Sequence, residues 1–276
     1  MATPLISIIT PVYNGAEYLP ALIDSVLMQD YPHYEHIIVN DGSDDDGATE
    51  AVLSRYPHLR WWGRENKGAY PSINEGLQAA QGEIVVVINA DDAFATPDAF
   101  SRVVAVWSDA VDLVYSPTQR IDDHGAILPY GDLLLLRNRW MLRHYLYIQH
   151  CSLFVRRSVL TEHALWWDTT FKYTGDWDWI LRLYDVARET RYIRPALASF
   201  RMHLGQTSRR DKTEAIQAEH RRICQRYGSS YRLHHAIQVL VNYRAMGLLA
   251  LDILRRQGAG ALVQRGQAWM KRKVAG

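Results

Sequence analysis

Short apolar runs alternate along the chain with longer segments whose apolar residues recur at helical spacing. Ile84–Ile88 is an unbroken run of β-branched residues, which is typical of a strand buried on both faces of a parallel sheet. Ala16–Met28 instead repeats its apolar residues every three or four positions, as an amphipathic helix does. The alternation predicts an α/β fold in which a mostly parallel sheet is flanked by helices.

The same pattern predicts where the individual elements lie. Strands are expected at Leu5–Thr10, Tyr34–Asn40, Leu59–Trp62, Ile84–Ile88, Val111–Ser116, Ser152–Val155 and Leu197–His203. The longer helices are expected at Ala16–Met28, Pro71–Ala80, Pro97–Ser108 and Asp176–Arg188. Between them, Arg120–Leu128 predicts a hairpin that turns at His124-Gly125, whereas Leu133–Leu136 and Trp140–Tyr147 fit a helix or a loop.

Beyond Thr207 the pattern is helical to the end, so we expect an α/β domain over residues 1–210 and a C-terminal helical region over residues 211–276. The tail Ile237–Lys273 mixes apolar residues with arginine and lysine, and no acidic residue follows Arg255. Such a composition suits an interfacial helix attracted to anionic lipid, which predicts peripheral membrane contact. Helices packed on the α/β domain, or on a second copy in a homodimer, explain the same pattern.

The composition excludes several classes of protein. The 276 residues carry a formal net charge of +1, which is no nucleic-acid footprint, so no nucleic acid partner is expected. No apolar run approaches the ~18 residues that span a bilayer. The strand expected at Leu5–Thr10 leaves no room for a signal peptide. Cys151 and Cys224 fit no metal-ligand spacing and predict a reducing, cytoplasmic compartment.

Polar residues gather where the predicted strands end. Thr10–Asn14, Asn40–Asp46 and Asn89–Asp92 each follow an apolar run, and Arg64–Lys67 adds positive charge after another. Parallel strands place their carboxyl ends on one edge of a sheet, where the ligands of open α/β folds bind. Carboxylates beside arginine and lysine suit a metal-bound diphosphate that carries a base and a sugar. For acidic pairs in loops generally, the alternative is a solvated turn that caps the next helix.

Spacing excludes several nucleotide-binding folds. No Gly-x-Gly-x-x-Gly follows the first strand and no Gly-x-x-x-x-Gly-Lys-Ser/Thr occurs, so the chain has neither a dinucleotide fingerprint nor a P-loop. Asp41–Gly47 suggests a calcium loop, but Asp46 stands where that loop requires glycine. A nucleotidylyltransferase would favour a first loop rich in glycine and lysine, and Pro11–Gly15 is not one.

Four motifs occur in a familiar order: Pro11-Val12-Tyr13-Asn14, Asp41-Gly42-Ser43-Asp44-Asp45, Asn66-Lys67-Gly68 and Asn89-Ala90-Asp91-Asp92. Over about residues 4–210 the chain resembles family 2 glycosyltransferases of the GT-A fold. The resemblance implies a Rossmann-like sheet and the inverting transfer of a sugar from a nucleotide-sugar donor. It also implies a donor site that includes Thr10, Pro11, Tyr13, Asp41, Arg64, Lys67, Asn74, Asn89 and Ala90, with Asp41 bonded to the base.

The resemblance further implies a divalent metal, Mn²⁺ or Mg²⁺, held by the last acid of a D-x-D motif, which is Asp91 here. Asn89 replaces the first acid and contributes no charge, so the expectation is either a weaker affinity for the metal or a contribution from Asp92. Carboxylates suit these ions, which they usually share with a substrate phosphate. Arg201-Met202-His203 is similar to a late Arg-x-His segment of the family, which makes His203 a candidate contact for metal or phosphate. A hydrogen-bonded structural histidine is the alternative.

An inverting transfer also needs a carboxylate that takes the proton of the acceptor hydroxyl. The resemblance places this base on Asp176, at the start of a predicted helix, while the glutamate that precedes it in the family is Gly175 here. The alternative is that Asp176 only caps the helix. Asp178 stands four residues before Arg182, which is the spacing of a helical salt bridge.

The expected function is therefore metal-dependent glycosyl transfer to a glycan or lipid-linked acceptor, in cell-envelope polysaccharide or lipid-linked glycan synthesis. Trp177, His150 and Gln149 are the candidate acceptor contacts, although tryptophans more often belong to a core. Because Asn89 and Gly175 replace two family acids, a catalytically silent protein that binds sugar nucleotides is the main alternative. The location expected is the cytoplasm, with peripheral contact at the inner membrane face.

Overall fold

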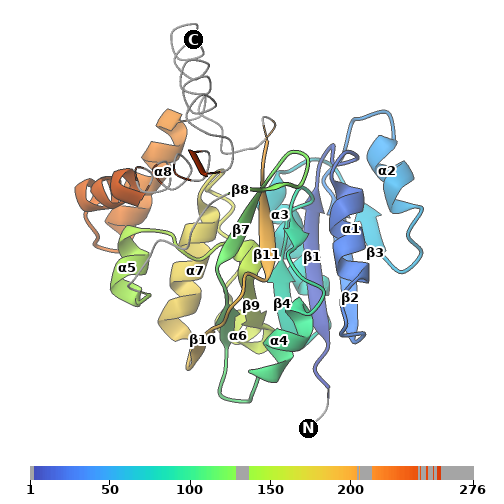
Figure 1. Ribbon diagram of the computed structural model, residues 1–276, viewed down its shortest axis with the longest axis horizontal. Coiled ribbons are helices and arrows are strands. Elements are labelled where there is room, and N and C mark those ends of the chain that lie inside the picture. The colour runs from blue at the N-terminus through green and yellow to red at the C-terminus, as the bar shows by residue number, and fades with distance from the viewer. Residues whose placement is uncertain are drawn as a thin grey trace, which may run out of the picture.

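The computed structural model of the chain contains two β-sheets flanked by helices (Figure 1). It describes residues 3–128, 137–203, 205, 213–241, 243, 247, 251, 254 and 255. The strands are β1 (Ile6–Val12), β2 (Tyr34–Asn40), β3 (Arg60–Gly63), β4 (Ile84–Val87), β5 (Ala93–Phe94), β6 (Leu113–Tyr115), β7 (Thr118–Asp122), β8 (Ile127–Leu128), β9 (Leu153–Arg156), β10 (Thr190–Tyr192) and β11 (Ala198–Met202). The helices are α1 (Leu19–Leu27), α2 (Ala48–Leu53), α3 (Ala69–Ala79), α4 (Ala99–Ala105), α5 (Arg139–His144), the 3₁₀ turn η1 (His150–Ser152), α6 (Arg157–Glu162), α7 (Gly175–Val186) and α8 (Thr213–Arg226).

The larger sheet has seven strands in the order β10-β6-β9-β4-β1-β2-β3. In its middle Ile9 pairs with Ile37 of β2 on one side and with Val87 of β4 on the other. All neighbours run parallel except β9, which is antiparallel to both β4 and β6. The mostly parallel sheet predicted from the sequence is thus confirmed. The strand predicted at Ser152–Val155 is present as β9, but its antiparallel direction was not predicted. The chain enters β9 through η1 and not directly from a crossover helix, so the direction has no local signal in the sequence.

A smaller sheet, in the order β5-β11-β7-β8, lies beside the carboxyl end of β4. Its strand β11 pairs antiparallel with β5, which begins directly after Asp92, and parallel with β7. The hairpin predicted over Arg120–Leu128 is confirmed as β7 and β8, with Gly125 at a positive φ of 85° in the turn. The small sheet therefore places the residues that follow β11 next to those that follow β4.

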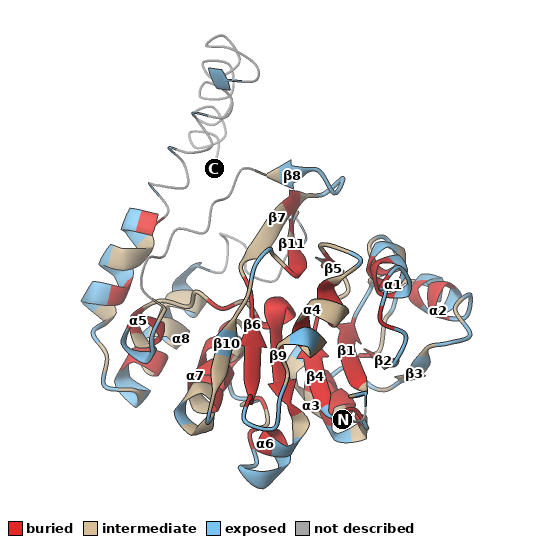
Figure 2. Cartoon of the chain, turned by 60° about the horizontal axis from the view of Figure 1, so that its bottom comes forward, coloured by how far each residue is buried: buried red, intermediate tan, exposed pale blue. Residues whose placement is uncertain are grey.

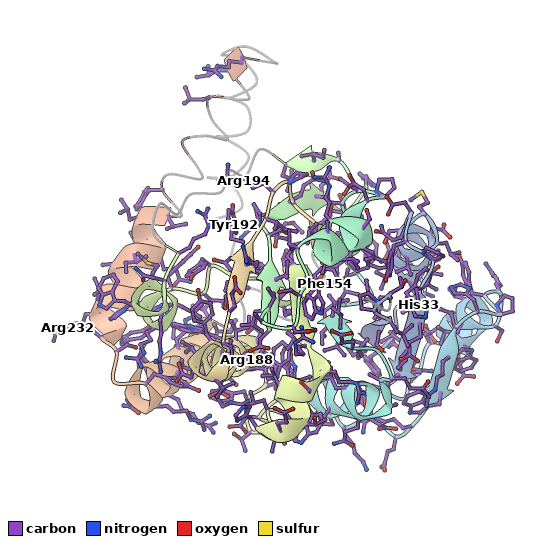
Figure 3. The ribbon with its side chains drawn as sticks, turned by 90° about the horizontal axis from the view of Figure 1, so that it is seen from below. His33, Phe154, Arg188, Tyr192, Arg194 and Arg232 are labelled. Carbon is purple, nitrogen blue, oxygen red and sulfur yellow. The ribbon has the colours of Figure 1, made fainter. Side chains whose placement is uncertain are left out.

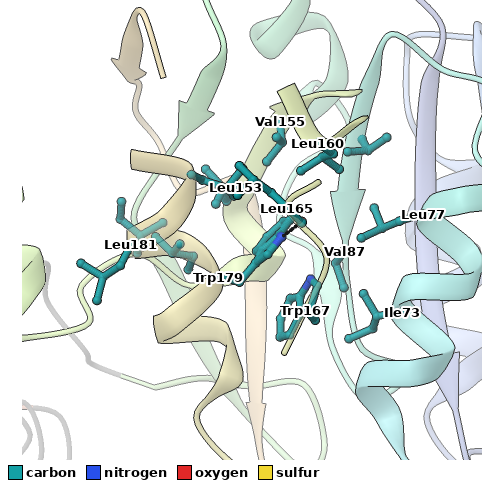
Figure 4. Packing of buried hydrophobic residues seen from close by; sticks show 14 of the residues in the cluster. Ile73, Leu77, Val87, Leu153, Val155, Leu160, Leu165, Trp167, Trp179 and Leu181 are labelled. Carbon is teal, nitrogen blue, oxygen red and sulfur yellow. Dashed lines mark hydrogen bonds between the residues drawn. The ribbon is translucent and has the colours of Figure 1, made fainter. Parts of the chain in front are cut away.

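The inner strands β1, β4, β6 and β9 of the large sheet are buried, as the β-branched runs predicted, whereas its edge strands β3 and β10 are partly exposed (Figure 2). Trp167 and Trp179 stack at 4.9 Å between α3 and β9, and the indole of Trp179 donates to the Leu165 carbonyl (Figure 4). Figure 3 shows Phe154 of β9 among the strands and Arg232 at the outer edge of the C-terminal helices. A continuous core thus joins the sheet to α3 and α7.

Several boundaries differ from the predicted ones. The first strand continues through Val12, while α1 begins only at Leu19 because residues 16–18 form a turn. The ambiguous segment after Arg137 contains α5, and Leu133–Leu136 lies outside the described residues. Helical structure resumes with α8 and residues 231–241, but most of the tail after these lies outside the described part. Among the described helices none is long and apolar enough to cross a membrane.

Candidate nucleotide-sugar site

The loops that follow β1 and β2 are hydrogen-bonded to each other. The Tyr13 hydroxyl and the Asn14 side-chain amide both donate to Asp44 Oδ1, at 2.9 and 2.6 Å. In return, Asp44 N donates to Asn14 Oδ1 at 2.9 Å, and Asn14 N donates to the Ser43 hydroxyl. The hydrogen bonds that Asp44 Oδ1 accepts from the side chains of Asn14 and Tyr13 lower the pKa of Asp44. Two of the polar clusters recognised in the sequence therefore form one structure, with the Tyr13 ring exposed beside it.

Asp41 ties the loop after β2 to the loop after β3. Its Oδ1 accepts from Arg64 Nη2 at 2.6 Å and from Lys67 N at 3.1 Å, and its Oδ2 accepts from Gly68 N at 2.7 Å. Gly42, at a positive φ of 70°, lies so close to this loop that a Cβ would meet Asn66 N at 2.8 Å. The carboxylate predicted to bond the base thus already orders the loop that presents Lys67, whose side chain is exposed.

Asp91 and His203 are in direct contact across the two sheets. Asp91 Oδ2 lies 2.8 Å from His203 Nε2. Arg201 fixes the backbone beneath this pair, because its Nε donates to the Asp91 carbonyl at 2.8 Å and its guanidinium lies over the ring of Tyr18. The Tyr18 ring in turn packs on His203 with 4.7 Å between centroids. A carboxylate and an imidazole that were predicted to share a metal are therefore adjacent.

Asp92 is placed differently from its neighbour. Its side chain is fully buried, and Oδ1 accepts from Arg201 N at 3.0 Å while Oδ2 has no hydrogen-bond partner in the described structure. Burial, and then the charge of Asp91, raises the pKa of Asp92 well above its ordinary value. A buried acid that favours its neutral form is a weaker metal ligand than the partly exposed Asp91.

The divalent metal implied by the sequence requires oxygen or nitrogen ligands close to Asp91. No group of three His, Cys, Asp or Glu side chains that could hold a metal occurs among the described residues. The contact between Asp91 and His203 supplies one carboxylate and one imidazole. Mg²⁺ keeps several waters and is commonly bound by one or two carboxylates together with substrate phosphates. The residues present therefore fit a metal site that the phosphates of a bound nucleotide would complete.

Asp176 lies in the first turn of α7 and keeps one oxygen open. Oδ1 accepts from Trp177 N at 2.9 Å, whereas Oδ2 lies 3.7 Å from His150 Nδ1 and accepts no hydrogen bond from the described part of the chain. The residue before it, Gly175, donates its N–H to the Tyr70 hydroxyl at 2.9 Å. Burial, and then the charge of Asp176, raises the pKa of Tyr70. Tyr70 therefore stays a neutral phenol beside the carboxylate.

His150 faces Asp176 from η1 and is itself almost buried. It is 8% exposed, and neither ring nitrogen has a hydrogen-bond partner among the described residues. Its ring packs edge-on against Trp167. Burial, and then the charges of Asp92 and Asp91, raises the pKa of the adjacent Cys151 thiol. The turn η1 thus lies between the acids after β4 and the acid of α7.

Three residues predicted to contact ligands are engaged inside the protein instead. Thr10 is fully buried, and its hydroxyl lies 3.1 Å from His36 Nε2. The side-chain amide of Asn74 bonds the backbone N–H and carbonyl of Trp167, at 2.8 and 2.9 Å. Trp177 is 1% exposed and donates its indole N–H to the Leu142 carbonyl, so its ring faces are covered by protein and leave no face for a sugar.

The other predicted residues lie at the same edge of the sheet. Pro11 is buried in β1, while Asn89 and Ala90 are partly exposed directly after β4. Gln149 precedes η1, and its carbonyl accepts from Ser152 N. The segment that begins at Arg201 continues with Gln206 and Ser208, which lie outside the described residues. Tyr70 and Glu219, which shape the loop around Asp176, carried no motif by which sequence analysis would find them.

The loops of this α/β sheet gather carboxylates, arginine and lysine beyond the carboxyl ends of its parallel strands, which is where open α/β proteins bind their ligands. The family model described as Glycosyl transferase family 2 matches residues 7–163, which is more than half of the chain. The chain belongs to glycosyl transferase family 2.

Relatives and solved structures agree with this membership. The chain spans 22 to 32% of the length of the first curated relatives it matches, which are glycosyltransferases of Rickettsia species. It is 28% identical to a PGL/p-HBAD biosynthesis glycosyltransferase of Mycobacterium bovis, over 72% of this chain and 78% of that one.

Two solved glycosyltransferases share its fold at low identity. TarS 1–349 of S. aureus, in complex with UDP, is 18% identical with a TM-score of 0.60, over 93% of this chain and 68% of that one. The mannosyltransferase PcManGT of Pyrobaculum calidifontis, in complex with GDP-Man and Mn²⁺, is 17% identical with a TM-score of 0.59, over 98% of this chain and 81% of that one. These likenesses confirm the predicted GT-A fold.

Proposed function

We propose that the protein is an inverting glycosyltransferase that moves a sugar from a nucleotide diphosphate donor to a hydroxyl of its acceptor. The observation that carries the proposal is the position of Asp176, whose Oδ2 is uncommitted and faces His150 from the start of α7. A carboxylate so placed takes the proton of the attacking hydroxyl as the bond to the sugar forms. The nucleotide diphosphate leaves in the same displacement, so no covalent intermediate on the protein is required.

The donor would lie along the edge formed by the loops after β1, β2, β3 and β4. Asp41, which holds Arg64 and the backbone of Lys67, supports a nucleotide pocket whose loops are ordered before the ligand arrives. The exposed Lys67 side chain supplies positive charge for the diphosphate, and the exposed ring of Tyr13 a surface for the base. The neighbours solved with UDP and with GDP-Man support this class of donor.

Asp91 and His203 are the residues that would hold a divalent cation, which when bound neutralises the charge of the departing diphosphate. Their 2.8 Å contact and the Mn²⁺ in PcManGT support this assignment. Asp92 contributes by fixing Arg201 under the pair, through the bond from Arg201 N to Oδ1. His150 and Gln149 would face the acceptor, since the ring nitrogens of His150 lie beside Asp176 and have no hydrogen-bond partner in the part of the chain that the structure describes.

We further propose a glycan or lipid-linked acceptor of the cell envelope and a cytoplasmic location. The M. bovis relative, whose name refers to PGL/p-HBAD biosynthesis, supports the first. The two free, buried cysteines, Cys151 and Cys224, support a reducing compartment. The basic tail predicted from the sequence supports contact with an anionic membrane face.

Nucleotide release tests the proposal. Wild-type protein and the Asp176→Asn variant are incubated with UDP-GlcNAc or GDP-mannose, with and without Mn²⁺, in the presence of a lipid extract that supplies acceptor hydroxyls. Released UDP or GDP is measured, and transfer of the sugar to water is counted in a sample without the extract. We expect Mn²⁺-dependent release by the wild type and a loss of ~10²- to 10⁴-fold in the variant, which is the usual contribution of a general base. Donor affinity, measured by calorimetry, should stay unchanged. Full activity in Asp176→Asn refutes its role as base, and donor binding without any release supports the silent binding protein instead.

A further inference from the structure

Helix α8 holds residues 172–174, which lie in the loop just before Asp176, through the carboxylate of Glu219. Glu219 Oε1 accepts from Lys172 N at 2.8 Å. Its Oε2 accepts from Tyr173 N at 3.0 Å and from Thr174 N at 2.9 Å. The Thr174 hydroxyl adds a fourth bond, at 3.0 Å. Three successive backbone N–H groups and one hydroxyl therefore converge on one negative charge, and hydrogen bonds to an ionised acceptor are the strong ones.

The same helix also contacts Asp168, earlier in this loop, and Asp178, in the first turn of α7. Arg226 Nη1 lies 2.6 Å from Asp178 Oδ1 and 3.0 Å from Asp168 Oδ2. The hydroxyl of Tyr227, which directly follows α8, donates to Asp178 Oδ1 at 2.8 Å. Asp178 is fully buried, so its charge depends on these partners. The candidate base Asp176 therefore lies between residues 172–174, which α8 holds, and Asp178, which α8 and Tyr227 hold.

These bonds fix the first turn of α7 in one placement. Residues 172–174 lead directly into α7, and Thr174 is the residue before its first turn. If the loop were free, Asp176 would sample positions away from His150, because a frayed first turn carries its side chains with it. The helix that prevents this comes from the region after residue 210, and both α7 and α8 lie beyond the residues 7–163 that the family model matches.

We propose that Glu219 is a positioning residue for the candidate base and that α8 belongs to the functional unit. The inference rests on the proposed function, because it concerns the same carboxylate, Asp176. Glu219 acts only through the loop: it holds three N–H groups, and the loop in turn sets the direction of Asp176 Oδ2. A reaction limited by the orientation of its base loses turnover when that orientation is lost, while the donor loops after β1, β2 and β3 are untouched.

The variant Glu219→Gln tests this, with Glu214→Gln as its matched control. Both residues lie on α8, but Glu214 is exposed in the first turn, away from the loop. We expect amide hydrogen exchange in peptides covering residues 168–178 to rise by about tenfold in Glu219→Gln and to stay at the wild-type rate in the control. Thr174→Val, which removes only the hydroxyl bond to Glu219, should show a smaller rise and serves if Glu219→Gln does not fold.

The kinetic readout is nucleotide release from UDP-GlcNAc or GDP-mannose with Mn²⁺. We expect kcat per folded molecule to fall about tenfold in Glu219→Gln with the donor KM unchanged. A loss of folded protein would also lower the apparent kcat at constant KM, so the folded fraction is measured by urea denaturation and kcat is corrected for it. If hydrogen exchange over residues 168–178 is unchanged in Glu219→Gln, Glu219 does not hold the loop. If exchange rises but kcat is unchanged, Glu219 holds the loop but does not position Asp176. If the wild-type protein releases no nucleotide while residues 168–178 are protected from hydrogen exchange, the proposed function is refuted, but the role of Glu219 in holding the loop is not.

Discussion

Replacing Gly175 by alanine tests whether Tyr70 is the reason that this chain lacks the family's glutamate. A Cβ built on Gly175 would lie 2.6 Å from Tyr70 Cε2 and 2.9 Å from its Cζ, which is closer than real Cβ atoms come to a ring. The ring cannot simply withdraw. It packs against Trp167 with 5.0 Å between centroids, and its hydroxyl accepts the Gly175 N–H at 2.9 Å. Tyr70 therefore occupies the space into which a side chain at position 175 would extend.

The magnitude follows from two opposed effects. Inserting a methyl group into such a packed contact costs about 1 to 3 kcal/mol. Alanine regains at most about 1 kcal/mol over glycine in a helix. The net expectation is that Gly175→Ala lowers the free energy of unfolding by about 1 to 2 kcal/mol. In a protein of this size each kcal/mol corresponds to about 2 to 4 °C in Tm.

The assay is a double-mutant cycle measured by urea denaturation. Tyr70→Leu removes the ring that causes the clash, so Gly175→Ala should be neutral or stabilising in that background. The coupling energy between the two sites should then be about 2 kcal/mol. Gly247→Ala is the control, because a Cβ there would meet nothing within 4 Å, and it should not destabilise. An equal cost of Gly175→Ala with and without the Tyr70 ring would refute the reasoning.

Two further predictions concern buried charge. Asp178→Ala removes the buried carboxylate that Arg182 and Arg226 share, so it should lower the free energy of unfolding by about 3 kcal/mol in urea denaturation; a loss below about 1 kcal/mol contradicts it. Burial lowers the pKa of His36 from 6.5 to about 3, so the unfolded chain takes up its proton first and stability falls as pH drops from about 6.5 towards 3. His36→Gln should remove about 1.4 kcal/mol per pH unit from that slope, and an unchanged slope between pH 4 and 6 would contradict it.

The parts of the fold that the sequence predicted are those with a local signal. Ile84–Ile88 is buried in the sheet because a β-branched run suits only a strand covered on both faces. The salt bridge from Asp178 to Arg182 is confirmed at 2.8 Å, because residues four apart face each other on a helix. Arg226 reaches the same carboxylate from 48 positions away, and no local pattern indicates such a partner.

In the candidate site, the motifs predicted where residues lie along the chain, but not the direction in which their side chains point. Thr10 lies in a strand where successive side chains point to opposite faces, and the structure turns it to His36 inside the protein. Asn74 has the predicted place on α3, yet both ends of its amide are taken by the backbone of Trp167. A motif that binds a ligand at the surface and a motif that holds two segments of the chain together can have the same sequence. Only the partner, which is distant in the chain, separates them.

The hydrogen bonds of the candidate site bear on where the functional unit ends. The loops at the donor edge are bonded to one another, whereas the segment that carries Asp176 is bonded to α8. Ile223 and Cys224 of α8 are buried in the same core as Trp179 of α7, so removing the helix would uncover that core as well as release the loop. A boundary at residue 210, which the sequence suggested, would separate the candidate base from the carboxylate that orients it. If Asp176 is the base, we expect the unit that transfers the sugar to extend at least through Tyr227, which makes the last contact to Asp178 among the described residues.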